Sequence, residues 1–313
     1  MDMKLLNHPQ MIDTISGFHI EPTNICTLKC PACPRTRFID HWPKKWHNHS
    51  LDINEVLNFL DIDLRGKAVN LCGAYGDPIY HNDFINFVEQ FKKRGAELTI
   101  VTNGSYKNKE WWSELVEKLD HNDVIHFSVD GIPENFTQYR VNGHWPSIQQ
   151  AMEVCAAAPV QTLWKYIPFS YNQNDIDAAR ALSQELGIDQ FGLQLSDRFD
   201  EGTEHLKPSP DLIGARYYVK ENWKKNTSVN SKFTPSCGKG NQHYITADGF
   251  YSPCCFLSDY RFYYKTQFGK NKKEYDIKNT TLSQLLEQAN VIKFYQTLDQ
   301  QPGCQFNCTE QLS

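Results

Sequence analysis

The chain has 313 residues, of which 40% are hydrophobic, and a formal net charge of −5. This length allows one large domain, or a barrel of roughly 200 residues with a smaller unit beside it. The negative charge disfavours broad binding of nucleic acid, which needs a basic surface. No apolar run approaches the ~18 residues that span a bilayer, and the first residues lack a signal-peptide core. We therefore expect a cytoplasmic protein with no membrane partner.

Through about residue 200, short apolar segments alternate with amphipathic ones, a pattern typical of a parallel sheet with crossover helices. The apolar segments predict strands at 18–20, 68–72, 98–102, 124–129, 163–167 and 191–195. The amphipathic segments predict helices at 52–60, 84–94, 109–119, 147–157 and 176–186. Six such β/α units predict an open, partial barrel. Beyond it the alternation stops, and the polar stretch 200–210 is expected to be a linker.

Three cysteines follow the first predicted strand, in the run N-I-C-T-L-K-C-P-A-C-P. They are Cys26, Cys30 and Cys33, with the spacing C-x3-C-x2-C. Four thiolates would close a zinc or iron–sulfur site. Three on one short loop can hold a [4Fe–4S] cluster by three of its irons and leave the fourth open for a substrate or cofactor. The alternative is a zinc knuckle that recruits a distant fourth ligand.

This spacing directly after a first strand resembles the signature of the radical S-adenosylmethionine (radical SAM) superfamily. The resemblance implies a partial (β/α)6 barrel over residues 1–199, a [4Fe–4S] cluster on the three cysteines, and S-adenosylmethionine as cofactor on the open iron. It implies an enzyme in which one-electron reduction releases a 5′-deoxyadenosyl radical that abstracts hydrogen from the substrate. An electron donor of the flavodoxin or ferredoxin type is expected as a partner.

The second predicted strand ends in G-A-Y-G-D-P, and reactive groups of parallel α/β folds lie at such strand ends. The run resembles the G-G-E-P motif, whose backbone and carboxylate receive the ammonium of the cofactor's methionine. Gly76, Asp77 and Pro78 match its last three positions, with Tyr75 and the shorter Asp as departures. Asp77 still supplies an acceptor. Water or backbone carbonyls are alternatives for that contact, and an ordinary turn is the alternative for the motif.

The next two strands also end in polar motifs. Asn103 stands in T-N-G after the third strand, and Ser128 and Asp130 stand in F-S-V-D-G after the fourth. By resemblance, Asn103 shapes the loop over the cofactor, while Ser128 and Asp130 approach the methionine carboxylate and the ribose hydroxyls. Arg140 follows ten residues later, where related enzymes have an arginine facing that carboxylate, a bidentate task that a guanidinium suits. Its alternative is an exposed surface arginine.

The C-terminal third has its own cysteines. Cys237, Cys254, Cys304 and Cys308 suit a four-cysteine [4Fe–4S] site between a β-hairpin and a C-terminal helix. The D-G-x-x-x-P-C pattern that ends at Cys254 resembles the twitch domain, the reduced form of the SPASM domain, which implies an auxiliary-cluster domain over residues 200–313. Cys255 is the alternative ligand to Cys254, although adjacent residues of a hairpin point opposite ways. A structural zinc ion is the alternative to the cluster.

The remaining cysteines and the histidines carry no such pattern. Cys72 and Cys155 stand alone in apolar segments, and we expect both to be packed core thiols. The eleven histidines have no metal-binding spacing, so we expect them at the surface or in the core.

The sequence is least specific about the substrate. Relatives with twitch or SPASM domains act on peptides, amino sugars and nucleotides, so we expect oxidation, cross-linking or epimerisation of a peptide or small polar metabolite, helped by the auxiliary cluster. A GTP cyclase is disfavoured because the chain ends in Q-L-S, without the paired glycines of that family. The alternative class is a non-catalytic iron–sulfur electron carrier or redox sensor. That class gives no reason for the motifs at successive strand ends.

Overall fold

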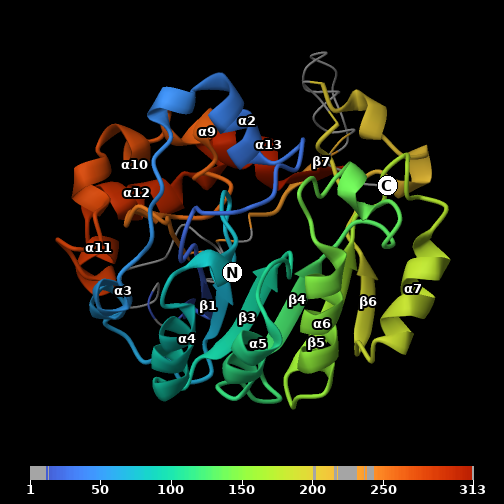
Figure 1. Ribbon diagram of the computed structural model, residues 1–313. Helices are drawn as coiled ribbons and strands as arrows, with labels where there is room; N and C mark the ends of the chain where they lie inside the picture. The colour runs from blue at the N-terminus through green and yellow to red at the C-terminus, as the bar shows by residue number, and fades with distance from the viewer. Residues whose placement is uncertain are drawn as a thin grey trace.

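The computed structural model describes residues 12, 14–199, 202–214, 217, 231–235, 237 and 243–311. Its main sheet has eight strands in the order β6-β5-β4-β3-β2-β1-β8-β9 (Figure 1). The first six strands along the chain are parallel: β1 (Gly17–Ile20), β2 (Ala68–Leu71), β3 (Glu97–Thr102), β4 (Val124–Ser128), β5 (Gln161–Tyr166) and β6 (Gln190–Leu193). The predicted partial barrel of six parallel strands is therefore confirmed.

Helices connect these strands, as the amphipathic segments predicted. They are α2 (Pro34–His41), α3 (Ile53–Phe59), α4 (Phe84–Lys93), α5 (Lys109–Val116), α6 (Trp145–Ala156) and α7 (Ile176–Glu185), with short 3-10 turns η2 (Pro43–Lys45), η3 (Pro78–Tyr80) and η4 (Phe136–Gln138). The sequence did not predict α2. It begins directly after Cys33 because Pro34 at its first position is preorganised for a helix start.

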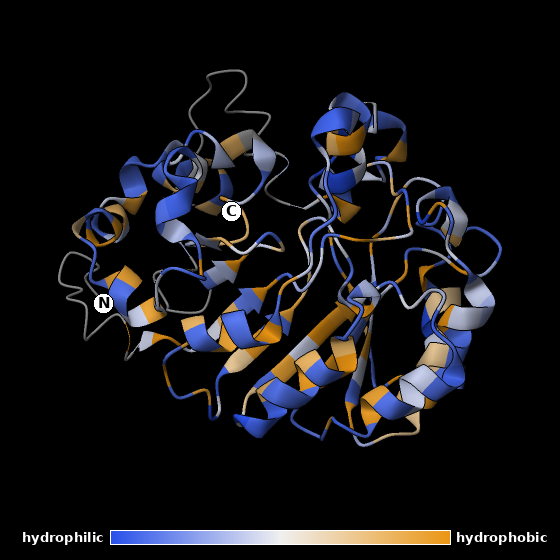
Figure 2. Cartoon of the chain, turned by 60° about the vertical axis from the view of Figure 1, so that its left-hand side comes forward, coloured by the Kyte–Doolittle hydropathy of each residue, from blue (hydrophilic) through white to orange (hydrophobic). Residues whose placement is uncertain are grey.

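The two faces of the parallel sheet differ because successive residues of a strand point to opposite sides. On the face toward the helices the side chains are large, and Phe127, Trp164 and Tyr166 are fully buried. The opposite, concave face carries half-buried and mostly polar side chains: His19, Asn70, Cys72, Thr99, His126, Ser128 and Lys165. Figure 2 shows hydrophobic residues along the strands, and helices whose turns mix hydrophobic and hydrophilic residues. The concave face is therefore the polar interior of the barrel.

The C-terminal region extends this sheet. Strand β8 (His243–Ile245) pairs parallel to β1, and β9 (Tyr251–Ser252) pairs antiparallel to β8. A separate two-stranded sheet joins β7 (Ser231–Phe233) to β10 (Thr309–Gln311). The other elements are η5 (Glu204–Leu206), η6 (Pro210–Leu212), α9 (Tyr260–Tyr263), α10 (Gln267–Lys270), η8 (Lys272–Tyr275), α11 (Leu282–Leu286), α12 (Ala289–Gln296), η9 (Leu298–Gln300) and α13 (Pro302–Cys308).

One apolar core runs from the barrel helices into the C-terminal region. It contains Phe87 of α4 and Trp112 of α5 together with Tyr251 of β9 and Leu285 of α11. The rings of Phe59 in α3 and Tyr251 lie 6.2 Å apart, so the hairpin packs against the barrel. No helix in the described part of the chain is long and apolar enough to cross a membrane.

Candidate active site

A cavity of about 250 Å³ lies at the C-terminal ends of the barrel strands. Most of the predicted site residues line it: Cys26, Cys30, Cys33, Gly76, Asp77, Asn103, Ser128 and Arg140. Pro78 and Asp130 are buried and do not line it. Residues from four separate motifs therefore meet around one space, as the strand-end rule predicts.

The three N-terminal thiols are held by a turn and by the start of α2. The backbone N–H of Cys33 donates to the carbonyl of Cys30 at 3.1 Å, and α2 begins at the next residue. Burial raises the pKa of Cys26 and of Cys30 to about 12, and the neighbouring thiols act in the same direction. Metal ions deprotonate coordinating thiols, so three thiols that share one cavity wall can serve as thiolate ligands of a cluster. The donor set therefore fits a three-thiolate cluster.

A single metal ion is a different case. Among the described residues, no three His, Cys, Asp or Glu side chains lie close enough together to share one ion. A [4Fe–4S] cluster distributes its thiolates over several irons.

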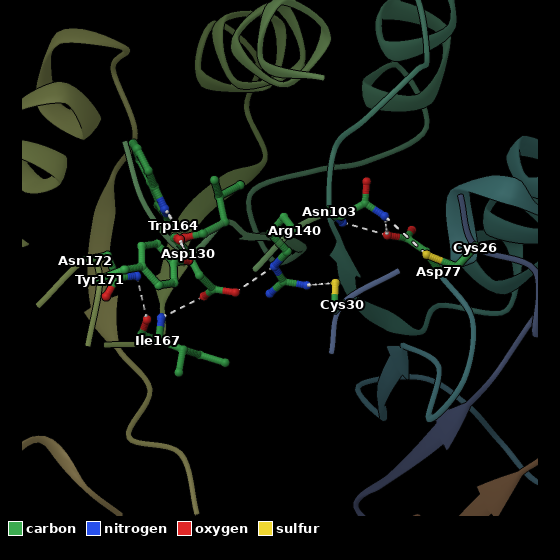
Figure 3. Close-up of polar contacts among 11 residues, drawn as sticks. Cys26, Cys30, Asp77, Asn103, Asp130, Arg140, Trp164, Ile167, Tyr171 and Asn172 are labelled. Carbon is green, nitrogen blue, oxygen red and sulfur yellow. Dashed lines mark hydrogen bonds and ion pairs between the residues drawn. The ribbon is translucent and has the colours of Figure 1, made fainter. Parts of the chain in front are cut away.

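Arg140 enters the cavity wall from the side opposite Asp77 and is held by Asp130 (Figure 3). Its Nε donates to Oδ2 of Asp130 at 2.6 Å, and its Nη1 lies 3.9 Å from Sγ of Cys30. The second oxygen of Asp130 accepts from the backbone N–H of Ile167 at 2.8 Å. Burial raises the pKa of Asp130, and Arg140 opposes that shift. The fixed guanidinium thus faces the thiol loop with Asp130 behind it.

Asp77 joins the loop after β2 to the loop after β3. Its Oδ2 accepts from the backbone N–H of Asn103 at 2.6 Å and from Nδ2 of Asn103 at 2.5 Å, while Oδ1 accepts from Ile79 at 3.3 Å. Nδ2 of Asn103 also lies 3.7 Å from Sγ of Cys26. Burial raises the pKa of Asp77 to about 6. Both carboxylate oxygens therefore already accept hydrogen bonds from the protein.

Glu21 is a site residue that the sequence reasoning missed. It follows β1 directly, and its Oε1 accepts from the backbone N–H groups of Tyr75 at 2.7 Å and Gly76 at 2.9 Å. Its Oε2 accepts from the hydroxyl of Tyr244 in β8 at 2.9 Å. Burial raises the pKa of Glu21 to about 7. The available signal was an acidic residue directly after the first strand.

The close fit of this loop explains its glycines. A Cβ on Gly73 would lie 2.7 Å from Oε1 of Glu21, and a Cβ on Gly76 would lie 1.9 Å from the carbonyl oxygen of Thr23. Only glycine allows these approaches. The G-A-Y-G loop therefore packs closely against Glu21 and the segment after β1.

The prediction for the lone cysteines is confirmed for Cys155 and wrong for Cys72. Cys155 is fully buried in the main core. Cys72 lines the first cavity instead, because it follows the fully buried Leu71 and therefore points to the concave face. The strand register decides this orientation, and the hydrophobicity of the segment does not.

The four C-terminal cysteines named from the sequence surround a second, small cavity. Cys237, Cys254, Cys304 and Cys308 line it together with apolar side chains such as Leu257 and Phe294. Cys254 follows the β8–β9 hairpin, and Cys304 and Cys308 belong to α13. Burial raises the pKa of Cys254 well above its usual range, and the thiols of Cys255 and Cys237 add to that shift.

Cys255 lies on a different side from its neighbour. It does not line the small cavity, and its charge raises the pKa values of Cys72 and Tyr244 in the barrel. This geometry favours Cys254 over Cys255 as the fourth thiol of the C-terminal group.

Tyr75 separates the first cavity from an aromatic one of about 130 Å³, and it lines both. The aromatic cavity is lined by Phe38, Trp46, Tyr260 and Tyr263, and the rings of Phe38 and Tyr260 lie 5.6 Å apart. The rings of Trp46 and Tyr75 lie 5.9 Å apart. The hydroxyl of Tyr75 accepts from the backbone N–H of Tyr260 at 2.9 Å, which ties the barrel loop to α9.

A match to a known protein family agrees with the geometry of the first cavity. The model of the radical SAM superfamily matches residues 20–183, which is more than half of the chain. The match includes all three N-terminal cysteines and every residue that lines the first cavity except Arg198.

Two curated proteins are similar in sequence. The chain is 32% identical over 117 residues to the tungsten-containing aldehyde ferredoxin oxidoreductase cofactor-modifying protein of Pyrococcus furiosus, covering 37% of this chain and 31% of that protein. The match thus spans about a third of that relative's length. This chain is also 20% identical over 277 residues to the GTP 3′,8-cyclase of Aliarcobacter butzleri, covering 78% of this chain and 81% of that protein.

Among solved structures, SuiB of Streptococcus suis has a similar fold. Its structure bound to S-adenosylmethionine gives a TM-score of 0.63 at 13% identity, covering 91% of this chain and 68% of that chain. Its structure bound to the precursor peptide SuiA gives a TM-score of 0.60 at 14% identity, covering 90% and 67%. At this identity the likeness concerns the fold.

Proposed function

Because the chain belongs to the radical SAM superfamily, we propose that it is an enzyme that cleaves S-adenosylmethionine reductively, using a [4Fe–4S] cluster on Cys26, Cys30 and Cys33. The observation that supports this most strongly is the meeting of these three thiols with Arg140 in one cavity. When bound, cluster and cofactor supply a carbon-centred radical that removes hydrogen from an otherwise inert C–H bond.

The chain's own residues orient the cofactor. The guanidinium of Arg140, fixed by Asp130, suits a carboxylate and would hold the methionine end. Asp77 locks Asn103 and the loop above β2 through Oδ2, while Oδ1, which accepts from Ile79 at 3.3 Å, keeps an acceptor position for the ammonium. Backbone carbonyls of the Gly73–Gly76 loop, which Glu21 keeps in place, would be the alternative partners of that ammonium. Gly76, Pro78 and Ser128 complete the proposed cofactor site.

The C-terminal cysteines would hold one auxiliary [4Fe–4S] cluster in a twitch-like domain. Cys237, Cys254, Cys304 and Cys308 surround one small, apolar cavity, which supports this assignment. When bound there, the cluster would supply an acceptor for one electron from the substrate, which an oxidation or an oxidative cross-link needs and an epimerisation does not. Residues 1–199 and 200–313 are the corresponding proposed domains, although β8 and β9 extend the barrel sheet.

The proposed substrate is a peptide or a small polar metabolite, and the change is oxidation, cross-linking or epimerisation. SuiB, which shares the fold, was solved with a precursor peptide, and the aromatic cavity beside Tyr75 offers a wall for a peptide side chain. The likeness to a GTP cyclase keeps nucleotides among the metabolites to be tried. We place the enzyme in the cytoplasm, with a flavodoxin- or ferredoxin-type protein as electron donor.

The test of the core proposal is anaerobic reconstitution with iron and sulfide, reduction, and chromatographic detection of 5′-deoxyadenosine. The protein is expected to form 5′-deoxyadenosine, whereas a variant with Cys26, Cys30 and Cys33 replaced by Ala is expected to form none. A matched control is Cys155→Ala, which removes a core thiol outside both groups. If the wild type forms clusters but no 5′-deoxyadenosine, the non-catalytic alternative, an electron carrier or redox sensor, replaces this proposal.

A further inference from the structure

The concave face of the barrel holds a second layer of side chains beneath the first cavity. The cavity wall includes Cys72, Val101, Ser128 and Ile167. Two positions earlier on the same four strands stand Asn70, Thr99, His126 and Lys165, which we call the lower layer. Because side chains repeat on one face every two residues, the lower layer lies directly below the cavity wall. Four neighbouring strands thus contribute one residue each.

Two members of the lower layer have buried polar atoms without partners. Oδ1 of Asn70 and Nδ1 of His126 are screened from solvent and form no hydrogen bond within the described part of the chain. Buried polar atoms in proteins nearly always form a hydrogen bond. Two such atoms that form none, on the same face of the sheet, therefore need an explanation. Here both atoms belong to the barrel interior, where a bound molecule can satisfy them.

Lys165 supplies the charge of the lower layer. It alternates with Trp164 and Tyr166, which are fully buried toward the helices, so its side chain points to the concave face. Its ammonium has no ion-pair or hydrogen-bond partner among the described residues. Burial raises the pKa of Cys72, directly after β2, to about 12, and the charge of Lys165 opposes that shift across two intervening strands.

Among the described residues, the other charged groups nearby do not pair with this cation. Burial lowers the pKa of His126 to about 4 and Lys165 adds to the shift, so His126 is neutral at pH 7. Asp130 is paired with Arg140. Asp77 accepts hydrogen bonds from Asn103 and Ile79. Glu21 accepts hydrogen bonds from the loop after β2 and from Tyr244. Lys165 is half-buried as a residue, and an ammonium without a counter-ion among the described residues favours an anionic ligand.

We propose that the lower layer recognises an anionic group of the substrate, a carboxylate or a phosphate, through Lys165, with His126 and Asn70 as hydrogen-bond partners. Oδ1 of Asn70 can only accept, so the substrate also carries an O–H or N–H near its anionic group. The term substrate rests on the proposed function, but the anion site does not. The substrate class is therefore an acidic one, such as an acidic peptide side chain or a phosphorylated metabolite.

The test uses the reconstituted holoenzyme with S-adenosylmethionine and no reductant, so that nothing turns over. Inorganic phosphate and carboxyl-labelled acetate are titrated in turn, and the NMR relaxation of their phosphorus and carbon nuclei reports binding. Wild type is expected to bind at least one of them saturably. Lys165→Met is expected to bind it roughly ten- to hundred-fold more weakly, the effect of losing a charge-assisted hydrogen bond. Lys109→Met, a change at an exposed position of α5, is the matched control and keeps wild-type affinity.

The outcomes separate the two proposals. Preference for phosphate or for acetate identifies the source of the anionic group. Equal anion affinity in wild type and Lys165→Met, or no saturable binding of either anion to wild type, overturns the inference. Lys165→Gln serves if the methionine variant fails to fold, and Lys165→Arg is expected to restore binding. Formation of 5′-deoxyadenosine by wild type is measured separately, so its absence removes the proposed function while the anion titration still decides this site.

Discussion

The two cysteine groups of this chain are built differently. Cys26, Cys30 and Cys33 lie within one short loop and face a cavity of about 250 Å³ with a charged and polar wall. The C-terminal four come from distant segments and surround a small space closed by apolar side chains. Three ligands beside an open polar space leave room for another molecule, whereas four in an apolar shell do not. Under the proposed function, this difference predicts that the N-terminal group is the site of the chemistry and that the C-terminal group stores electrons or stabilises the fold.

The largest expected effect comes from removing the N-terminal group. Replacing Cys26, Cys30 and Cys33 by Ala is expected to lower bound iron from about eight to about four per chain and to abolish cofactor cleavage, because one of two four-iron clusters is lost. Iron analysis and 5′-deoxyadenosine detection measure both effects. Cys155→Ala is the control and keeps both values. Full iron retention by the triple variant would show that these three cysteines hold no cluster. The contrast drawn between the two cysteine groups would then fail.

Removing cysteines of the C-terminal group is expected to abolish product formation while cleavage of the cofactor continues. Cys304→Ala with Cys308→Ala should still cleave the cofactor without forming product, because radical generation needs only the barrel site while oxidation of the substrate needs an acceptor. Product analysis alongside 5′-deoxyadenosine detection checks this. Circular dichroism and the spectrum of the remaining cluster must be normal, since metal sites also stabilise folds. Wild-type product formation would mean that the C-terminal group is structural only.

A smaller effect is expected at the wall of the first cavity. Arg140→Ala should weaken binding of S-adenosylmethionine roughly ten- to hundred-fold, because a charge-assisted hydrogen bond to the carboxylate is lost. Asp130→Asn should weaken it less, since Arg140 keeps its charge but loses the partner at 2.6 Å. Calorimetry on cluster-loaded protein measures both, with the exposed Arg65→Ala as control. Unchanged affinity in Arg140→Ala would mean that the cofactor's carboxylate lies elsewhere.

The smallest expected effect concerns Glu21, which links the two regions through Tyr75, Gly76 and Tyr244. Its raised pKa, about 7, means that the native state holds this proton more tightly than the unfolded chain. The stability that this group contributes is therefore full below about pH 4.5, its ordinary pKa, and is lost as the pH rises from there through about 7. Glu21→Gln cannot ionise and keeps the acceptor for Tyr75 and Gly76. It should be more stable than wild type at pH 8, by ~2 kcal/mol relative to their difference at pH 5.

Unfolding curves of both proteins across that pH range measure the difference. Asp77, whose pKa is also raised, titrates in both proteins and cancels in the comparison. Parallel stability curves for wild type and Glu21→Gln would show that this carboxyl does not couple the barrel loop to β8.

The sequence predicted the parts of the site that follow from local pattern. The alternation of apolar segments predicted the six strands, and the strand-end rule predicted that Cys30, Asn103 and Arg140 would meet. It could not predict that both oxygens of Asp77 are used within the protein, because this depends on how two loops pack. The orientation of Cys72 depends on strand register, and the pairing of β8 with β1 depends on contacts between opposite ends of the chain. Such non-local contacts leave no periodic signal.

The pairing of β1 with β8 also bears on how the protein is made. Phe18 pairs with His243, and these residues are 225 positions apart (243 − 18). At ~5–20 residues per second, a ribosome needs roughly 10–45 s to synthesise the intervening chain. During that interval one edge of β1 has no strand beside it, and unpaired edges are templates for aggregation. Slow translation at low temperature lengthens this exposure, so soluble yield is expected to depend on chaperones that bind the nascent barrel until its last strand emerges.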